Sequence, residues 1–181
     1  MRASVSVYLV TGLQASGKST VARLLAERFE PSAHVEGDVM WKLVVGGRAD
    51  MTDDPTPEAA RQLELRYRHG AMLAQSFADN GFTAVHNDII LGDHLRRYSK
   101  LVSHRPLQIV VLCPRPEVVA DRELGRGSSA YRSWMTGGRT LLDAIEVHQT
   151  WLDATRRIGT WIDSSDQTPD QTVDEILERT T

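Results

Sequence analysis

The feature that most constrains this chain is a glycine-rich segment, Gly12–Ser19, which reads Gly-Leu-Gln-Ala-Ser-Gly-Lys-Ser. An apolar run, Val5–Val10, precedes it, and a run with helical periodicity, Thr20–Phe29, follows it. Glycines let the backbone turn its N–H groups around an anion, and a helix start adds unpaired N–H groups and the positive end of its dipole. The strand-loop-helix context therefore predicts a phosphate-binding P-loop, with a glycine turn that matches by chance as the alternative.

The P-loop supplies the residues predicted to bind a nucleotide. Lys18 offers a point charge to the β- and γ-phosphates of a nucleoside triphosphate, and Ser19 offers a hydroxyl to Mg²⁺. The full set predicted to contact the nucleotide is Gly12, Leu13, Gln14, Ala15, Ser16, Gly17, Lys18, Ser19 and Thr20.

Five apolar segments alternate with helical patterns along the 181 residues, at 5–11, 33–36, 82–87, 107–113 and 160–163. This alternation predicts an α/β fold with a five-stranded parallel sheet, right-handed crossovers and helices on both faces. Because the P-loop occupies the first strand-helix turn, we expect the three-layer αβα P-loop nucleoside triphosphate hydrolase fold, in its nucleoside-monophosphate-kinase-like form with a lid. The length suits one domain spanning 1–181.

Helices are predicted at about 18–29, 39–45, 56–80, 93–102, 114–124, 141–155 and 169–179. Two of them have strong start signals, because Thr56-Pro57-Glu58 and Thr168-Pro169-Asp170-Gln171 place a capping side chain before a first-turn proline.

Bulk composition excludes several classes of protein. The formal net charge is −3, whereas a protein that grips nucleic acid without sequence preference is usually basic. Cys113 is the one cysteine, so no disulfide can form within the chain. The sequence has no leader pattern and no apolar segment of bilayer length, and we therefore expect a cytoplasmic protein without a membrane partner.

Two acidic residues follow predicted strands and are expected at the ligand-binding edge of the sheet. Asp38 is the candidate to deprotonate or orient an acceptor hydroxyl, with a plain helix N-cap as the alternative. Glu36, two residues earlier, projects to the same side of its strand and is a candidate second substrate contact. Asp88 is expected to help hold Mg²⁺, directly or through water, with a strand-end turn former as the alternative. Residues of about 38–80 form the expected acceptor side.

Two arginines, Arg122 and Arg126, lie four residues apart and so share a helix face. They are predicted to neutralise charge on a transferring phosphoryl group, and a surface pair with Asp121 or Glu123 is the alternative. The glycine-, serine- and arginine-rich segment that follows, about 125–138, suits a lid over a nucleotide, with a solvated loop as the alternative.

The remaining histidines and aromatic residues give weaker signals. The six histidines form no metal-binding pattern, and His86, within a predicted strand, is expected to be a packed residue. Core packing and an acceptor pocket are both open for Trp41, Tyr67, Tyr131 and Trp134.

Nearly the whole chain resembles the chloramphenicol phosphotransferase-like group of small P-loop kinases, which are AAA-type ATP-binding kinases. It is similar more distantly to gluconate and shikimate kinases, zeta toxins and polynucleotide 5′-kinases. The resemblance is carried by Gly12–Thr20, Gly37-Asp38, Asn87–Gly92, Cys113–Gly127 and Asp163–Ser165. It implies ATP as donor, Mg²⁺, a small-molecule hydroxyl acceptor, Asp38 as the hydroxyl-activating carboxylate, and Arg122 and Arg126 as lid arginines.

The sequence departs from these families at three places. Ser128-Ser129 replaces the acidic-basic pair expected after Gly127, and Asn87-Asp88 replaces two acidic residues. Polynucleotide kinases have an arginine where this chain has Trp41 and Lys42, which weakens the case for a nucleic-acid substrate.

Three functions therefore stay open. The first is an ATP-dependent small-molecule O-phosphotransferase that acts on an antibiotic or a metabolite. The second is a polynucleotide 5′-kinase or nucleotide-sugar kinase, for which Arg96 and Arg97 are the one hint. The third is a non-enzymatic ATP-binding switch. The acceptor, the oligomeric state and the preference for adenine or guanine are not determined by the sequence.

Overall fold

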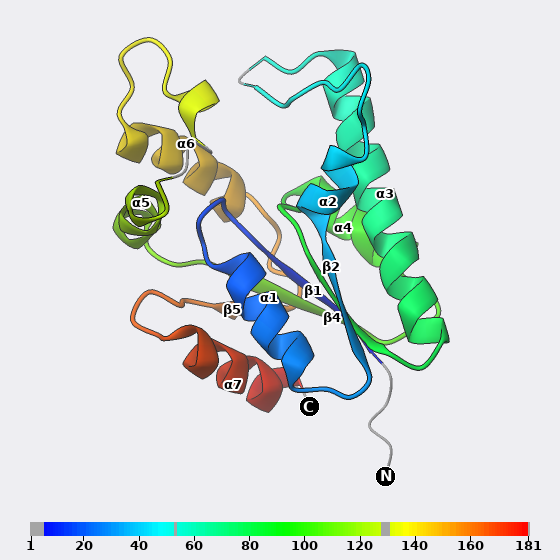
Figure 1. The fold of residues 1–181 in the computed structure, drawn as a ribbon. Helices are drawn as coiled ribbons and strands as arrows, with labels where there is room; N and C mark the ends of the chain where they lie inside the picture. Colours follow the sequence, from blue (N-terminus) through cyan, green and yellow to red (C-terminus); the bar gives the residue numbers. More distant parts are fainter. Residues whose placement is uncertain (1–5, 53, 128–130, 181) are drawn as a thin grey trace.

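The structure is a computed structural model that describes residues 6–52, 54–127 and 131–180. Its centre is a five-stranded parallel sheet, with the strands in the order β2-β3-β1-β4-β5 (Figure 1). The strands are β1 (Val7–Gly12), β2 (Ser32–Glu36), β3 (Thr83–Asn87), β4 (Leu107–Leu112) and β5 (Thr160–Ile162). The predicted fold class is confirmed. The first strand ends one residue later than expected, and Val5 lies outside the described residues.

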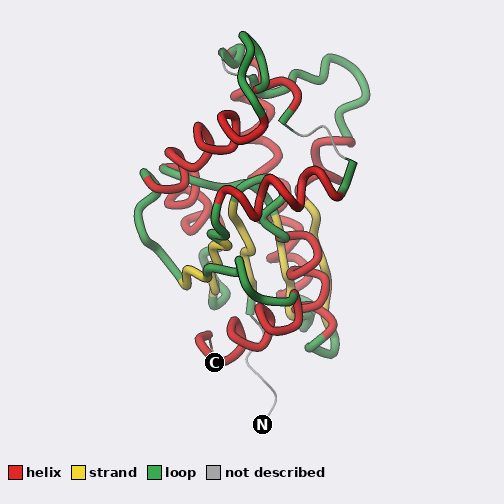
Figure 2. Tube along the Cα trace, turned by 90° about the vertical axis from the view of Figure 1, so that its left-hand side faces the viewer, coloured by secondary structure: helices red, strands yellow, loops and turns green. Residues whose placement is uncertain are grey.

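Helices join the strands and cover both faces of the sheet (Figures 1 and 2). They are α1 (Lys18–Glu27), α2 (Gly37–Lys42), α3 (Pro57–Asp79), α4 (Asp93–Leu101), α5 (Pro116–Gly125), the 3-10 turn η1 (Arg132–Trp134), α6 (Leu141–Asp153) and α7 (Pro169–Thr180). The predicted helix at 39–45 was wrong in its limits: it begins at Gly37 and ends at Lys42.

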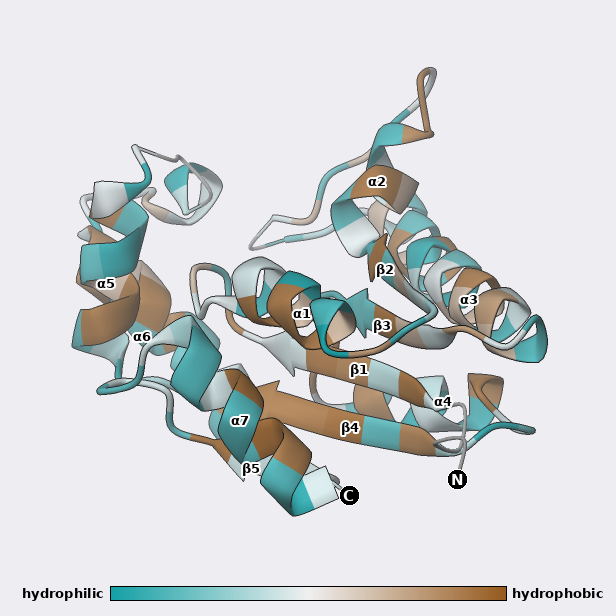
Figure 3. Cartoon of the chain, turned by 60° about the horizontal axis from the view of Figure 1, so that its bottom comes forward, coloured by the Kyte–Doolittle hydropathy of each residue, from teal (hydrophilic) through white to brown (hydrophobic). Residues whose placement is uncertain are grey.

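Alternating residues of the central strand enter two different cores. Val7 and Leu9 of β1 pack toward α3 and α4, whereas Tyr8 and Val10 pack toward α1 and α7. This division follows from the two-residue period of a strand. Because both faces are covered, β1 and β4 are apolar along much of their length, as the brown ribbons of Figure 3 show.

Helix caps define where the connecting segments end. The Thr56 Oγ1 accepts a hydrogen bond from the Ala59 N–H at the start of α3, as predicted. Thr168 and Gln171 form the predicted reciprocal cap of α7. Thr140 and Asp143 form a further capping box at α6, which the sequence analysis missed although the Thr-x-x-Asp spacing signals it.

Two groups of elements rise beyond the carboxyl ends of the strands (Figure 1). One contains α2, the start of α3 and the segment between them; the other contains α5, α6 and the turn η1. The second group has its own small core, in which Ala15 of the P-loop packs with residues of α5 and α6. Among the helices described, none has the length and apolar character needed to cross a bilayer.

Gly70 of α3 is a tight contact that yields a stability prediction. A Cβ atom at this position would come within 3.0 Å of the imidazole of His86. His86 is buried in β3, and its Nδ1 is hydrogen-bonded to the Tyr98 hydroxyl at 2.7 Å, so the ring has a fixed position. We expect Gly70→Ala to lower the free energy of unfolding by about 1–3 kcal/mol in urea titrations, although alanine is the better helix former. Gly125→Ala, where a Cβ meets nothing within 4 Å, is the control and should be near neutral. Equal stability of the two variants would contradict the predicted overpacking.

Candidate functional site

A cavity of about 510 Å³ lies where the P-loop and the start of α1 meet the end of β3, helices α2, α3 and α5, and the start of α7. Six of the side chains predicted to act on phosphate, metal or acceptor line it, namely Lys18, Ser19, Asp38, Asp88, Arg122 and Arg126, whereas Glu36 does not. The other P-loop residues from Gln14 to Thr20 also line the cavity, whereas Gly12 and Leu13 are buried and do not line it. The tertiary structure thus gathers residues from positions 14 to 172 into one site.

The P-loop has the backbone conformation that its glycines make possible. Gly12 and Gly17 have φ values of 148° and 96°, and Ala15 has a φ of 62°. A Cβ at Gly12 would also collide with the carbonyl oxygen of Leu112 on β4, so both the φ angle and the close strand contact require glycine there. Successive N–H groups in such a turn form a concave anion-binding site before the start of α1.

Lys18 is the charged centre of the loop. Its side chain is buried, with the residue 7% exposed, and its Nζ donates a hydrogen bond of 2.6 Å to the Leu13 carbonyl. Burial lowers the pKa of Lys18 to about 8, and the carboxylates of Asp88 and Asp38 partly oppose this shift. The ammonium is therefore charged at neutral pH, and the nearby carboxylates offset only part of the cost of burying that charge. An anionic ligand would provide the missing compensation.

Ser16, at the centre of the loop, carries a buried hydroxyl without a hydrogen-bond partner in the part of the chain that is described. Burying such a group without a partner is unfavourable. Because the residue lines the cavity beside Lys18, a phosphate oxygen could satisfy the hydroxyl. The loop therefore fits a polyphosphate by charge and by hydrogen-bonding capacity.

Asn87 at the end of β3 orients the Ser19 hydroxyl, a role that the sequence analysis missed. The Asn87 side-chain amide donates to Ser19 Oγ at 3.2 Å, and its Oδ1 lies 2.6 Å from Nε2 of His34 on the neighbouring strand β2. With Oδ1 on the side of His34, the Nε2–H tautomer of His34 donates to it and the amide nitrogen faces Ser19. This arrangement leaves the Ser19 oxygen with acceptor capacity toward the cavity.

Asp88 is paired with Arg66 of α3, a residue that the sequence analysis did not identify. Arg66 Nε donates to Asp88 Oδ2 at 2.7 Å, and its Nη2 contacts both Asp88 Oδ1 and, at 3.1 Å, Asp38 Oδ1. The Asp88 side chain is 1% exposed and also accepts from the Ile89 N–H, so it partly fulfils the expected turn-forming role. Its role toward a metal stays a prediction.

Gly37 makes room for this ion pair. A Cβ atom at Gly37 would collide with both carboxylate oxygens of Asp88. The two residues of the Gly37-Asp38 pair therefore have different roles. Gly37 leaves space for the Asp88 carboxylate, and Asp38 places its own carboxylate at the cavity.

Asp38 lies in the first turn of α2, and its side chain is 69% exposed. The alternative that it is the N-cap is wrong, because the N-cap residue is Glu36 and no side chain caps this helix. Glu36 itself does not line the cavity and lies 4.0 Å from His34, so its contact with a substrate stays a prediction. The Asp38 carboxylate is accessible: its Oδ1 accepts one hydrogen bond from Arg66, and its Oδ2 can accept from another donor.

Arg122 of α5 bridges the P-loop and the loop before α7. It donates to the Ser16 carbonyl at 3.1 Å and to the Ser164 carbonyl at 2.8 Å, so the alternative of a surface pair is wrong for this residue. Its partial burial lowers its pKa, although an arginine stays charged. Arg126, one turn further on, also lines the cavity.

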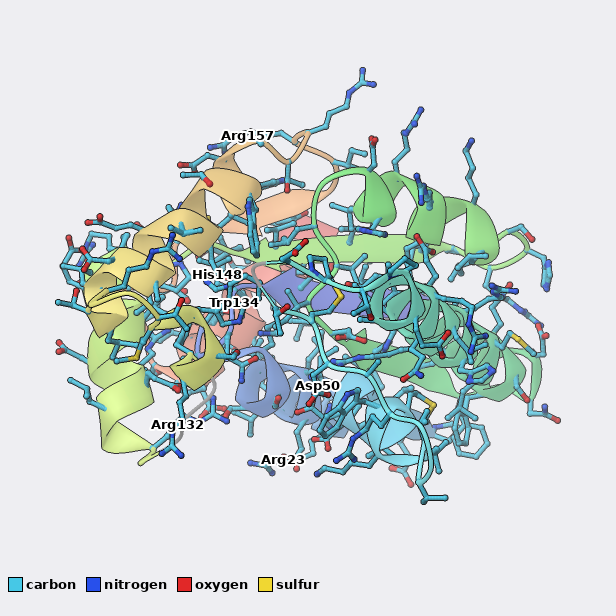
Figure 4. The ribbon with its side chains drawn as sticks, turned by 90° about the horizontal axis from the view of Figure 1, so that it is seen from above. Arg23, Asp50, Arg132, Trp134, His148 and Arg157 are labelled. Carbon is cyan, nitrogen blue, oxygen red and sulfur yellow. The ribbon has the colours of Figure 1, made fainter. Side chains whose placement is uncertain are left out.

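The lid segment, residues 125–138, is described except at 128–130, where the substituted serines lie. Tyr131 donates from its hydroxyl to the Gln14 carbonyl at 2.9 Å and packs with Trp134, His148 and Trp151 in an aromatic cluster on α6. Figure 4 shows Trp134 beside His148, with Arg132 at the periphery. Whether this segment closes over a ligand stays a prediction.

Of the four aromatic residues considered for an acceptor pocket, none lines the cavity in the described part of the chain. Trp41 donates to Asp50, Tyr67 donates to the Ile89 carbonyl, and Tyr131 and Trp134 belong to the cluster on α6. Packing is therefore the better interpretation of Tyr67, Tyr131 and Trp134, whereas Trp41 belongs to none of the hydrophobic cores of the described residues and lies against the Arg48 guanidinium. His86 is a packed residue, as predicted, and burial lowers its pKa to about 4.

A glycine-rich loop after the first strand of a parallel sheet, with a lysine and three arginines at one cavity, defines a P-loop protein of the kinase-like fold. Residues 7–149 match the family described as AAA domain, and the chain belongs to this family. No curated protein matches the sequence.

Solved structures confirm the fold. The APS kinase of Mycobacterium tuberculosis, in complex with AMPPNP and APS, has a TM-score of 0.68 and 18% identity, with 98% of each chain covered. An unliganded sugar kinase from Janibacter sp. HTCC2649 has a TM-score of 0.65 and 19% identity, with 97% of this chain and 94% of that chain covered. The tunicamycin resistance protein of Deinococcus radiodurans has a TM-score of 0.65 and 16% identity, with 97% and 95% covered.

Proposed function

We propose that this protein is an ATP-dependent phosphotransferase that moves the γ-phosphate of ATP to a hydroxyl of a small molecule. One observation carries the proposal: a single cavity contains both the P-loop with its buried Lys18 and the accessible carboxylate of Asp38. Phosphoryl transfer needs this combination of charge neutralisation and acceptor positioning. The similar solved structures include a sugar kinase and an APS kinase, which supports the same class of reaction.

The reaction is an in-line displacement. The acceptor hydroxyl oxygen attacks the γ-phosphorus, the bond from that phosphorus to the β–γ bridging oxygen breaks, and ADP leaves with the electron pair. Asp38 accepts the hydroxyl proton or orients the hydroxyl as its proton is lost. Lys18, Arg122 and Arg126 neutralise charge on the phosphoryl oxygens, and residues 125–138 act as the lid while 38–80 form the acceptor side.

The oxygen donors of the cavity fit Mg²⁺ bound mainly through phosphates and water. Ser19, held by Asn87, has an oxygen free to act as a ligand, and Mg²⁺ prefers such hard donors. Asp88 would act through water, because Arg66 contacts both of its oxygens. No cluster of three or more His, Cys, Asp or Glu side chains suited to a metal occurs within the described ranges. When bound, Mg²⁺ would supply charge neutralisation for the β- and γ-phosphates.

The two other functions left open by the sequence have less support. Arg97 pairs with Glu64 at 2.8 Å, Arg96 lies 3.8 Å from Asp93, and neither arginine lines the cavity. These arginines therefore offer no basic path to Asp38 for a polynucleotide. A non-enzymatic switch would need the P-loop but would leave the accessible Asp38 carboxylate without a role.

Transfer of labelled γ-phosphate tests the proposal. The wild-type protein is incubated with ATP, Mg²⁺ and panels of sugars, alcohols, nucleosides, oligonucleotides and antibiotics, and phosphorylated acceptor is separated from free phosphate. Antibiotics are included in the panel for two reasons. A tunicamycin resistance protein is among the structures with a similar fold, and the sequence resembles chloramphenicol phosphotransferase-like kinases. We expect transfer to a small hydroxyl compound above background hydrolysis. Transfer to oligonucleotide ends alone, or to none of the acceptors, would contradict the proposal.

A further inference from the structure

We propose that the acceptor carries no negative charge near its reacting hydroxyl, so that its class is a neutral polyol or an amino alcohol. The proposal rests on the proposed function and specifies the substrate of the same site. Its basis is that Arg66, the cation on the acceptor side of the cavity, is already committed to two carboxylates of the protein.

The charged residues that line the cavity divide by the element that carries them. Lys18 comes from α1, and Arg122 and Arg126 come from or directly follow α5, beside the P-loop. Their charges suit the phosphates. Asp38, Arg66 and Asp88 come from α2, α3 and the end of β3. Among the described residues of the lining, Arg66 is therefore the cation from the acceptor side.

The positive charge of the Arg66 guanidinium is already compensated by carboxylates of the protein, through three of its five N–H donors. The guanidinium forms a bidentate pair with Asp88 and a further bond of 3.1 Å to Asp38. If a substrate carboxylate drew Arg66 away, the Asp88 side chain, 1% exposed, would keep only the Ile89 N–H among its hydrogen bonds shown here. An uncompensated buried charge is strongly destabilising, so Arg66 is held in place.

The packing around the Arg66–Asp88 pair also keeps Arg66 in place. The absence of a Cβ at Gly37 is what admits the Asp88 carboxylate, so Asp88 and Arg66 occupy a space formed by the backbone of the β2–α2 junction. Exposed ion pairs exchange partners easily because solvent and side-chain entropy compete with them. This pair is mostly buried and bidentate, which makes Arg66 a positioning residue for Asp38.

The charge balance then selects the acceptor. Asp38, Asp88 and Arg66 sum to one net negative charge. The charge of Lys18 also attracts both carboxylates, but it belongs to the P-loop and is the charge offered to the phosphates. A carboxylate, sulfate or phosphate on the acceptor would meet like charge at short range, whereas a hydroxyl can donate to Asp38 and an ammonium is attracted. Neutral and cationic acceptors are therefore favoured.

A stability cycle tests the commitment of Arg66 without any acceptor. Urea unfolding is measured for the wild type, Arg66→Gln, Asp88→Asn and the double variant. We expect Arg66→Gln to lower the midpoint clearly and the added Asp88→Asn to recover much of the loss, because removing both charges is less harmful than isolating one. An unchanged or raised midpoint for Arg66→Gln would overturn the proposal, since Arg66 would then be free to bind an anion.

An acceptor comparison tests the selectivity. Several carbon skeletons are each supplied as the neutral polyol, the amino compound and the carboxylate, for example a hexose, an amino hexose and a hexuronate. We expect kcat/KM to be lower for the carboxylate by roughly 100-fold. Preferred use of the carboxylate would overturn the proposal. Absence of transfer to every acceptor would refute the proposed function instead, and the stability cycle would still decide whether Arg66 is committed.

Discussion

Lys18→Met is expected to abolish phosphotransfer and, at the same time, to stabilise the nucleotide-free protein. The loss of transfer follows from removal of the ammonium that neutralises the phosphates, and a fall of at least about 10²–10³ in kcat is typical for removing one such group. The gain in stability follows from burial, which lowers the pKa of Lys18 from 10.5 to about 8. At neutral pH the folded protein therefore holds a buried charge that the unfolded chain holds in water.

The expected gain is about 1–3 kcal/mol in the free energy of unfolding at pH 7, since each pKa unit corresponds to about 1.4 kcal/mol. Loss of the Lys18 hydrogen bond has a small effect, because the Leu13 carbonyl also accepts from the Ser16 N–H. Methionine keeps the length and apolar character of the side chain, so it fills the same space.

The sign of the pH dependence separates this explanation from a simple packing gain. In the wild type the penalty is complete below about pH 8 and disappears as pH rises toward 10.5, because the folded state loses its proton first. The advantage of Lys18→Met should therefore be largest near pH 7 and should shrink by about pH 10. Urea titrations at both pH values measure it, with Lys42→Met on the exposed end of α2 as the control. An advantage that is constant with pH would contradict the pKa argument.

Asp38→Asn is expected to lower kcat by about 10²–10⁴ while nucleotide affinity stays nearly the same. Asparagine cannot accept the hydroxyl proton, and general-base groups typically contribute a factor of this size. Because the side chain is 69% exposed and its pair with Arg66 is one contact of 3.1 Å, we expect a stability change of less than about 1 kcal/mol. Asparagine also retains an oxygen that can accept from Arg66.

Single-turnover transfer and nucleotide titration measure the two effects separately. Asp93→Asn is a matched control, because Asp93 is an exposed aspartate in the first turn of α4 and lies outside the main cavity. If Asp38→Asn transferred phosphate at the wild-type rate, the acceptor-side role of Asp38 would be refuted. If it lost nucleotide binding instead, Asp38 would belong to the phosphate site.

Contiguous features were predictable from the sequence because local chemistry encodes them. The P-loop needs glycines at positions with positive φ, a lysine and a hydroxyl, and these residues occur in a fixed order within eight positions of the sequence. Strand and helix order followed from apolar periodicity, and the caps at Thr56 and Thr168 followed from their spacing. Element limits were less accurate, as for α2, because tertiary packing decides where a helix frays.

The acceptor side of the site was not predictable in the same way. Arg66 is 22 residues from Asp88 and 28 from Asp38, and no spacing rule links an arginine in the middle of a long helix to two strand ends. Its partners were set by how α3 packs on β3, where Gly70 lets the helix approach His86. For the same reason Asn87, which in sequence replaced an expected acid, acquired its role through contacts with Ser19 and His34.

The sequence by itself determined that this chain forms a parallel P-loop fold and which loop is predicted to bind phosphate, because those properties depend on residues that are neighbours along the chain. Only the tertiary structure decided the charge of the acceptor side. Arg66 is neutralised by Asp88 because α3, β2 and β3 converge there and Gly37 has no side chain, and a buried ion pair of this kind depends on distances that exist only after folding.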